Sequence, residues 1–318
     1  MSKRLSYLDY IRVVACMMVV AIHVSAEYMF ISQEWSMVFN IAFLVDKMSR
    51  IAVPLFFMIS GKLYLSKEKF DFKVFLRKTW FPLLGMYILW NLLYAIRRGY
   101  SSFGVLLQEG SFHLWFIPVI LGIYLLLPIL RSLNEELLKW LLLITFVTEI
   151  LLTTLRLTLP YFGIVTQIAS MQYCSYLFYF LLGYFLDMKK GNILYGVLWL
   201  LSNICFGCLS IYVFHNIGIF FEYNHLVVCF EACCFYLMMN GICTKRSLSI
   251  ERLGSLTLNI YFCHMFFVYL FKAYGFIQKY NMIVVYSMVL IFSAVVSLII
   301  NQIVRLCKGG KKDFMLSR

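Results

Sequence analysis

The sequence is dominated by long apolar stretches that recur along its whole length and are separated by short, charge-rich segments. A helix that crosses about 30 Å of hydrocarbon needs about 20 apolar residues, because it rises about 1.5 Å per residue. Apolar windows that can serve this purpose fall at residues 8–28, 37–65, 80–96, 113–130, 137–157, 172–187, 192–213, 223–243, 254–274 and 281–304. We therefore expect an all-α integral membrane protein, a bundle of about ten transmembrane helices forming a single domain over residues 1–318.

Composition also places the chain in lipid and excludes several other classes of protein. Hydrophobic residues make up 63% of the chain and charged residues 14%, whereas about a quarter of the residues of a soluble domain are charged. The net charge of +13 comes mostly from Lys and Arg between the apolar windows, where they orient helices, so we expect no nucleic-acid partner. The spacing of Cys205 and Cys208 is that of a metal or redox motif, but no histidine or second cysteine pair accompanies them. We expect no metal site and no permanently bound cofactor.

The positions of Lys and Arg predict how the chain is oriented in the membrane. When alternate connections are assigned to opposite sides, nineteen of these residues fall on one side and five on the other. Both termini are therefore expected in the cytoplasm, with residues 305–318 as a short basic tail. Charged residues around Arg50 interrupt the window 37–65, which forms either one crossing or an interfacial piece followed by a short crossing. The basic segment 67–78 favours one crossing, because it then lies on the same side as the N-terminus.

Four ionisable side chains are expected at hydrocarbon depth within the apolar windows: His23, Glu149, Glu231 and His264. Such a residue costs about 2.5–3.5 kcal/mol at the centre of a membrane helix on insertion scales, so each of them suggests a function. The alternative is that each forms a hydrogen bond to a neighbouring helix inside the bundle. For Glu149 and Glu231 the sequence favours neither interpretation.

His23 differs from the other three because Arg12 precedes it by eleven residues on the same predicted helix. That separation makes three turns plus about 20° and a rise of about 16 Å, so the two side chains share one face. Asp9, three residues before Arg12, is placed to pair with the guanidinium. Arg12 is expected near the cytoplasmic edge and His23 near the middle of the membrane. Glu27, one turn further, is either a solvated carboxylate or a group that orients the imidazole.

The shared face of Arg12 and His23 combines two chemical capacities. A guanidinium at the cytosolic edge binds phosphate oxygens in pairs, and a neutral imidazole deeper in the membrane takes a proton from a hydroxyl. The pattern therefore indicates transfer of a group from a phosphate-bearing donor. In that reaction Arg12 binds the donor and His23 is the general base.

These residues belong to a set of motifs spread over about residues 8–300. The first is Leu8-Asp9-Tyr10-Ile11-Arg12 with its spacing to His23. The others are Arg50 with Pro54-Leu55-Phe56-Phe57-Met58-Ile59-Ser60-Gly61, Arg77 with Pro82, His113-Leu114-Trp115-Phe116 with Tyr124 and Pro128, and Ile260-Tyr261-Phe262-Cys263-His264. Together they resemble the motifs of acyltransferase family 3, a family of integral membrane acyltransferases.

The resemblance implies ten helices in a bacterial plasma membrane and a donor, acyl-CoA or more narrowly acetyl-CoA, that is used from the cytoplasm. It implies O-acylation of a cell-envelope or exported carbohydrate as the reaction. It also implies that Arg50 and Arg77 join Arg12 in binding the donor. Residues 137–245 match none of the motifs, and we expect acceptor specificity to reside there.

A further group of motif residues is expected either to bind the carbohydrate acceptor or to serve the structure. Its members are Ser60, His113, Trp115, Tyr261 and His264. His113 and Trp115 are expected at the outer mouth of the fourth helix, where imidazole and indole can hydrogen-bond and stack on a sugar. The alternative there is an ordinary interfacial belt of aromatic residues.

Other functions remain open at this point. In a transporter or flippase of an envelope glycan precursor, intramembrane His and Glu residues relay protons or line a substrate path. In a structural or sensory subunit, the shared face of Arg12 and His23 would have no purpose. An acyl-enzyme on Ser60 or a cysteine is a variant of the enzymatic function, although neither has a partner base identifiable in the sequence.

Overall fold

The computed structural model describes most of the chain, namely residues 5–97, 112–164, 176–186, 191–216 and 218–307. The described residues form helices and turns and contain no strand, which confirms the all-α class. Most of the expected basic tail, residues 308–318, lies outside them, as do the first four residues.

Contacts divide the chain into two compact units, which we call unit 1 and unit 2. Unit 1 comprises Met1–Ser66 and Arg131–Gly254, and unit 2 comprises Lys67–Leu130 and Ser255–Arg318. Each unit is thus built from two separate stretches of sequence. The expected single domain over residues 1–318 stays a prediction.

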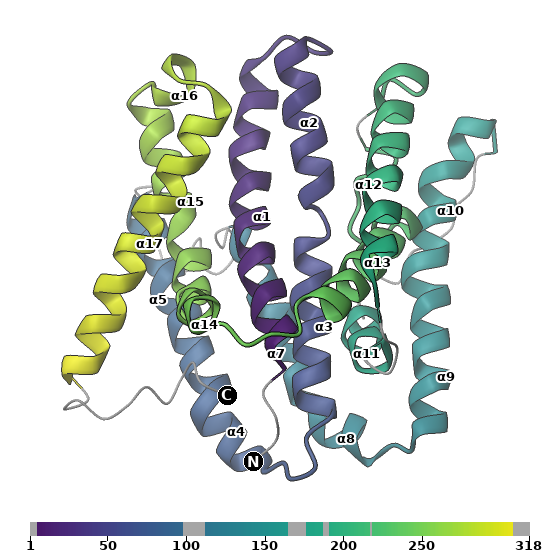
Figure 1. Ribbon diagram of the computed structural model, residues 1–318, viewed down its shortest axis with the longest axis vertical. Helices are drawn as coiled ribbons and strands as arrows, with labels where there is room; N and C mark the ends of the chain where they lie inside the picture. Colours follow the sequence, from purple (N-terminus) through teal and green to yellow (C-terminus); the bar gives the residue numbers. More distant parts are fainter. Residues whose placement is uncertain (1–4, 98–111, 165–175, 187–190, 217, 308–318) are drawn as a thin grey trace. The chain divides into compact units, whose positions relative to one another are not determined.

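Unit 1 is built around the first helix. Its helices are α1 (Ser6–Ile31), α2 (Met37–Ser49), α3 (Ala52–Leu65), α9 (Glu135–Thr145), α10 (Leu152–Thr158), α11 (Leu177–Leu186), α12 (Ile193–Cys208), α13 (Leu226–Ile242) and α14 (Leu248–Gly254). Short turns of other helix types extend three of them: η3 (Phe146–Leu151), η4 (Leu159–Phe162) and η6 (Leu209–Val213). As Figure 1 shows, α1 packs along α2 and α3, and contacts also join α3 to α11 and α12 to α13.

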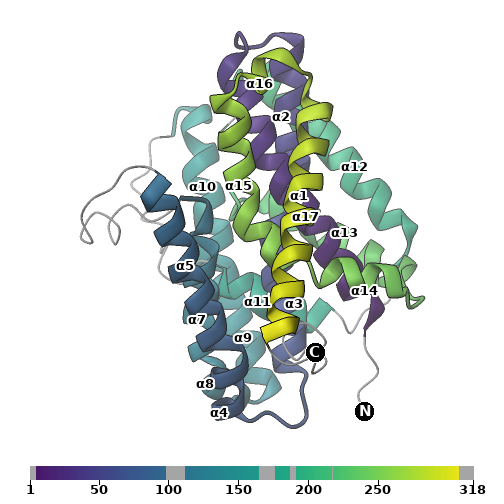
Figure 2. The ribbon, with the colours of Figure 1, turned by 90° about the vertical axis from the view of Figure 1, so that its left-hand side faces the viewer.

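Unit 2 is organised around α15. Its elements are α4 (Phe72–Phe75), η1 (Leu76–Trp80), α5 (Phe81–Arg97), η2 (Phe112–Leu114), α7 (Phe116–Leu125), α15 (Thr257–Ala273), α16 (Phe276–Lys279) and α17 (Met282–Cys307). α15 contacts α5, α16 and α17, and Figure 2 shows α15 and α17 side by side. The chain leaves unit 2 for unit 1 along α8 (Leu127–Ser132).

Each of the ten apolar windows contains a helix. Within the described residues, five helical stretches are long and apolar enough to cross a membrane: Ser6–Ile31, Phe72–Arg97, Glu135–Phe162, Ile193–Val213 and Met282–Val304. A sixth is obtained if Leu248–Gly254 and Thr257–Ala273 form one broken span. These stretches make the chain a multi-pass membrane protein, whereas the number of ten crossings stays a prediction.

The second apolar window is broken between α2 and α3, at Arg50 and Ile51. Pro54 explains the position, because a proline has no N–H to donate and its ring clashes with the carbonyl four residues earlier, that of Arg50. The α-helical pattern of main-chain hydrogen bonds resumes at Leu55, whose N–H donates to the Ile51 carbonyl at 3.0 Å. The two pieces follow one another beside α1, which contacts both (Figure 1). This arrangement supports a single crossing interrupted at Arg50.

α3 and α11 approach until their main chains touch. A Cβ atom at Gly61 would collide with the main chain of Phe180, and one at Gly183 would collide with that of Met58. Small residues at helix crossings allow this close approach in membrane proteins. Gly61, the last residue of the second motif, therefore has a packing role.

We expect both termini to report a cytoplasmic location in fusion experiments, because of the nineteen-to-five distribution of Lys and Arg. A fluorescent-protein fusion after Arg318 should fluoresce, and an alkaline phosphatase fusion there should be inactive. A translocated C-terminus would contradict the topology. In that case the window 37–65, which is broken at Arg50, would form two crossings instead of one.

Candidate active site

Arg12 and His23 lie on one uninterrupted helix, since α1 runs from Ser6 to Ile31. Their separation therefore corresponds to a common face and about 16 Å along the axis. Arg12 Nη1 donates to Asp9 Oδ1 at 3.0 Å, so the expected pair is present. The Arg12 side chain is 24% exposed and that of Asp9 only 6%, and His23 is half-buried. α1 thus holds an oriented guanidinium and an imidazole that are both only partly covered.

Arg50 lies at the break between α2 and α3 and is held from two directions. Its Nε is 2.8 Å from Asp46 Oδ1, and its Nη2 donates to Asp46 Oδ2 at 3.2 Å. The guanidinium carbon lies 3.5 Å from the centroid of the Phe221 ring and 5.3 Å from that of Tyr223. The Arg50 side chain keeps 16% exposure, whereas Asp46 is fully buried. The charge of Arg50 is therefore balanced by Asp46, and its plane is directed by aromatic rings.

Ser60 is half-buried on α3, next to the glycine at which α3 meets α11. It belongs to unit 1, as Arg12, His23 and Arg50 do. The structure thus carries four of the candidate residues on α1, on α3 and at the break between α2 and α3, and α1 contacts both α2 and α3.

In unit 2 the structure brings together His113, Tyr261 and His264. The hydroxyl of Tyr261 donates to the main-chain oxygen of His113 at 2.7 Å. The ring of His113 packs edge-to-face on that of His264, with centroids 5.7 Å apart, and on that of Tyr94 at 4.7 Å. All four residues are buried. They form a compact group of imidazole and phenol side chains.

Main-chain contacts determine which nitrogen of His264 carries the proton. Its Nδ1 lies 2.7 Å from the Tyr261 oxygen and 3.1 Å from the Ile260 oxygen. Because carbonyl oxygens only accept, Nδ1 is the donor, and Nε2 of the neutral ring is the acceptor. His264 is therefore a buried neutral imidazole of defined tautomer, with the proton on Nδ1.

Tyr94 ties α5 to the turn of α15 that carries His264. Its hydroxyl donates to the Phe262 oxygen at 2.8 Å and accepts from the Phe266 N–H at 3.1 Å. These two main-chain groups are a donor and an acceptor four residues apart, the pair that bonds within an α-helix. The contact places Tyr94 against both His113 and the segment around His264.

The two glutamates of the apolar windows, Glu149 and Glu231, contact other parts of unit 1. Glu149 lies in η3 and accepts the main-chain N–H groups of Tyr176 and Phe178 at 3.0 and 3.4 Å, so it caps the start of α11. Glu231 lies on α13 and pairs with Lys47 at 2.6 Å. These contacts favour the interpretation that both residues bond to neighbouring helices.

The sequence model of one protein family, described as an acyltransferase domain, matches residues 5–302. The chain belongs to acyltransferase family 3. It is therefore a membrane acyltransferase, in agreement with the motifs and with its apolar helices. No curated protein and no solved structure matches the chain.

Two candidate residues of this family 3 acyltransferase, Trp115 and Arg77, remain to be placed. Trp115 is half-buried directly before α7, and the next residue, Phe116, packs its ring 5.9 Å from that of Tyr261. Arg77 lies in η1 and is exposed. Both belong to unit 2.

Several neighbours of the candidate residues were not predicted. Asp46 stands four residues before Arg50, and this ion-pair spacing is a signal that could have found it. Phe221 and Tyr223 are far from Arg50 in the sequence, and Tyr94 is one of 22 tyrosines. Their roles depend on tertiary contacts, and no local pattern distinguishes them.

Proposed function

We propose that the protein transfers an acyl group, acetyl in the simplest case, from acyl-CoA to a hydroxyl of a cell-envelope or exported carbohydrate at the bacterial plasma membrane. The observation that carries the proposal is the shared face of α1, where Arg12, oriented by Asp9, and His23 are both partly exposed. The family assignment supports acyl transfer as the reaction.

In the proposed reaction His23 takes the proton of the acceptor hydroxyl as the oxygen attacks the thioester carbonyl. An ester C–O bond forms, the C–S bond breaks, and the proton passes to the sulfur of the leaving CoA. The products are the acylated carbohydrate and free CoA, so atoms and protons balance without a covalent acyl-enzyme.

On the donor side, Arg12 is proposed to bind phosphate oxygens of CoA, for which a planar guanidinium is suited. Arg50, with 16% of its side chain exposed, is proposed to assist it. The participation of Arg77 stays a prediction from its motif.

On the acceptor side, the half-buried Trp115 is the group best suited to stack on a sugar. His113 and His264 are buried, with the ring of His113 against Tyr94 and that of His264 against Tyr261. We propose that these four side chains together shape the acceptor site. The role of Ser60, without an acyl-enzyme, stays a prediction from its motif.

The direct test is acyl transfer by detergent-purified protein supplied with radiolabelled acetyl-CoA and envelope glycan. We expect release of free CoA thiol and label in the glycan in equal amounts. A flippase or sensory subunit would release no CoA. Comparison of glycan acetylation in cells with and without the gene identifies the acceptor.

Replacing Arg12 with lysine is expected to raise the KM for acyl-CoA about tenfold while kcat falls less, because the charge remains but the two-pronged geometry for phosphate is lost. Steady-state kinetics on the purified variant measures both constants. Arg97→Lys, on the opposite side of the membrane by charge distribution, is the matched control and should keep the KM of the unaltered protein. An unchanged KM in Arg12→Lys would refute the donor role of this residue.

A further inference from the structure

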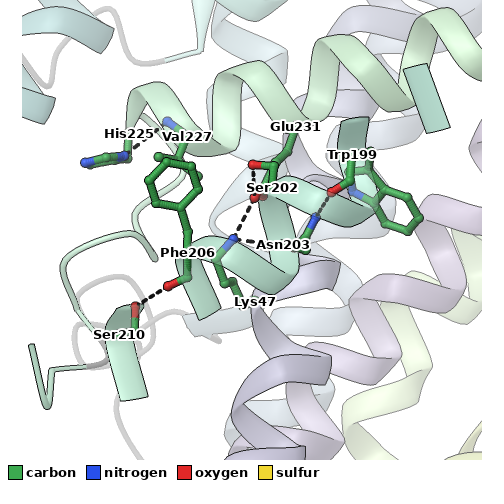
Figure 3. Close-up of polar contacts among 9 residues, drawn as sticks. All are labelled: Lys47, Trp199, Ser202, Asn203, Phe206, Ser210, His225, Val227 and Glu231. Atoms are coloured by element: carbon green, nitrogen blue, oxygen red, sulfur yellow. Dashed lines mark hydrogen bonds and ion pairs between the residues drawn. The ribbon is translucent and has the colours of Figure 1, made fainter. Parts of the chain in front are cut away.

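A buried ion pair lies beside the break in the second apolar window. Together with its hydrogen-bond partners it joins three helices of unit 1. Lys47 Nζ lies 2.6 Å from Glu231 Oε1, and the two side chains are 1% and 0% exposed. Ser202 Oγ donates to the same Oε1 at 2.9 Å, and Lys47 Nζ donates to Asn203 Oδ1 at 3.4 Å. Figure 3 shows these groups converging from α2, α12 and α13. None of them has a part in the reaction proposed above.

Stability alone does not account for this pair. Taking two charges out of water is costly, and replacing a buried pair with apolar residues of similar size is often neutral or stabilising. A charged pair restricts the relative orientation of the two helices that carry it. The amine and the carboxylate must meet in one geometry, whereas apolar side chains pack in several. The pair therefore fixes the rotation and register of the end of α2 against α13.

The end of α2 is also where Arg50 lies. Lys47 precedes Arg50 by three residues, and the Arg50 N–H donates to the Lys47 carbonyl at 3.1 Å. The two cations are thus less than one helical turn apart, so fixing the first constrains the second.

One segment of the chain, residues 221–231, contacts both cations. Phe221 and Tyr223 lie against the guanidinium of Arg50, and Glu231 binds the amine of Lys47. Between them, His225 caps α13 by accepting the N–H of Val227 at 3.1 Å, which sets the direction in which the segment enters the helix. The segment falls within residues 137–245, the part of the sequence without family motifs.

We propose that Glu231 is a positioning residue for donor binding, which acts through Lys47 to set the direction of the Arg50 guanidinium. The inference rests on the proposed function, in which Arg50 binds the phosphates of acyl-CoA. Binding of phosphate by a guanidinium depends on the orientation of its N–H groups. Loss of the Lys47–Glu231 pair therefore weakens donor binding without altering the base at His23.

The test is the double substitution Lys47→Met with Glu231→Met, which removes both charges and leaves none unpaired. We expect the KM for acetyl-CoA and the calorimetric Kd for CoA to rise about tenfold, with kcat within about twofold of the unaltered protein. Exchanging the charges, Lys47→Glu with Glu231→Lys, is expected to recover most of the loss. Ser210→Ala is the matched control: this hydroxyl, also drawn in Figure 3, bonds to the Phe206 carbonyl of its own helical segment.

Unaltered KM and Kd in a folded double-methionine variant would overturn the proposal, since the pair would then serve stability alone. If that variant does not fold, Glu231→Gln keeps the size of the side chain and removes the carboxylate that binds the Lys47 amine. It must raise the KM for acetyl-CoA, or the proposal fails. An Arg50→Lys variant tests the donor role of Arg50 separately from the positioning role of Glu231. An unchanged KM for acetyl-CoA in this variant refutes the donor role. A raised KM in Arg50→Lys with a normal double variant refutes the positioning role only.

Discussion

Replacing His23 with alanine is expected to lower kcat about 10²–10⁴-fold while CoA still binds. The reason is the geometry of α1, in which His23 is about 16 Å along the axis from Arg12, too far to touch the phosphates that Arg12 is proposed to bind. Removing the imidazole takes away the proposed general base and leaves the proposed donor site in place. Rates of acyl transfer and calorimetric binding of CoA by the same purified variant measure the two effects separately.

Two further variants on the same helix complete this experiment. His23→Gln keeps a polar side chain of similar size but cannot take the proton, so it should be as slow as His23→Ala. Met17→Ala alters a side chain that is 43% exposed, on the helix between Arg12 and His23, and should remain fully active. Full activity in His23→Ala would refute the proposed role of His23 as general base. Loss of CoA binding in that variant, with none lost in Arg12→Lys, would reverse the two roles.

Replacing Gly61 with valine is expected to destabilise the fold by about 3 kcal/mol or more, at or beyond the upper end of the usual range for overpacking. The added side chain would collide with the main chain of Phe180, which has no rotamer to relieve the clash. α3 and α11 would then have to separate, and Gly183 against Met58 would lose its contact too. Thermal unfolding in detergent and the yield of monodisperse protein measure the effect.

The matched control for Gly61 is another glycine inside a helix. Gly85 on α5 is exposed, and no described atom lies within 4 Å of the Cβ it would gain. Gly85→Ala should leave the melting temperature unchanged or raise it, since alanine is favoured over glycine in a helix by up to about 1 kcal/mol. Equal stability of Gly61→Val and Gly85→Ala would mean that α3 and α11 do not pack as closely as described.

Local physical rules made much of this protein predictable from its sequence. The length and polarity of the apolar windows were enough to predict helices, because in each of them the residues are apolar over enough turns to need lipid or other helices around them. The Arg12 and His23 face followed from helical periodicity alone, since α1 is continuous and the angle between two of its side chains depends only on their separation. The motifs, read together, predicted the family that the match over residues 5–302 shows.

Contacts between distant residues required the tertiary structure. Phe221 and Tyr223 against Arg50, Glu231 against Lys47, and Tyr94 against α15 join segments with no spacing rule between them. The choice between function and structure for Glu149 depended in the same way on which N–H groups lie in reach, those of Tyr176 and Phe178. Periodicity determines which side of a helix a residue occupies. Which partner meets it there is decided by how the helices pack, because that depends on the shapes of all the side chains between them.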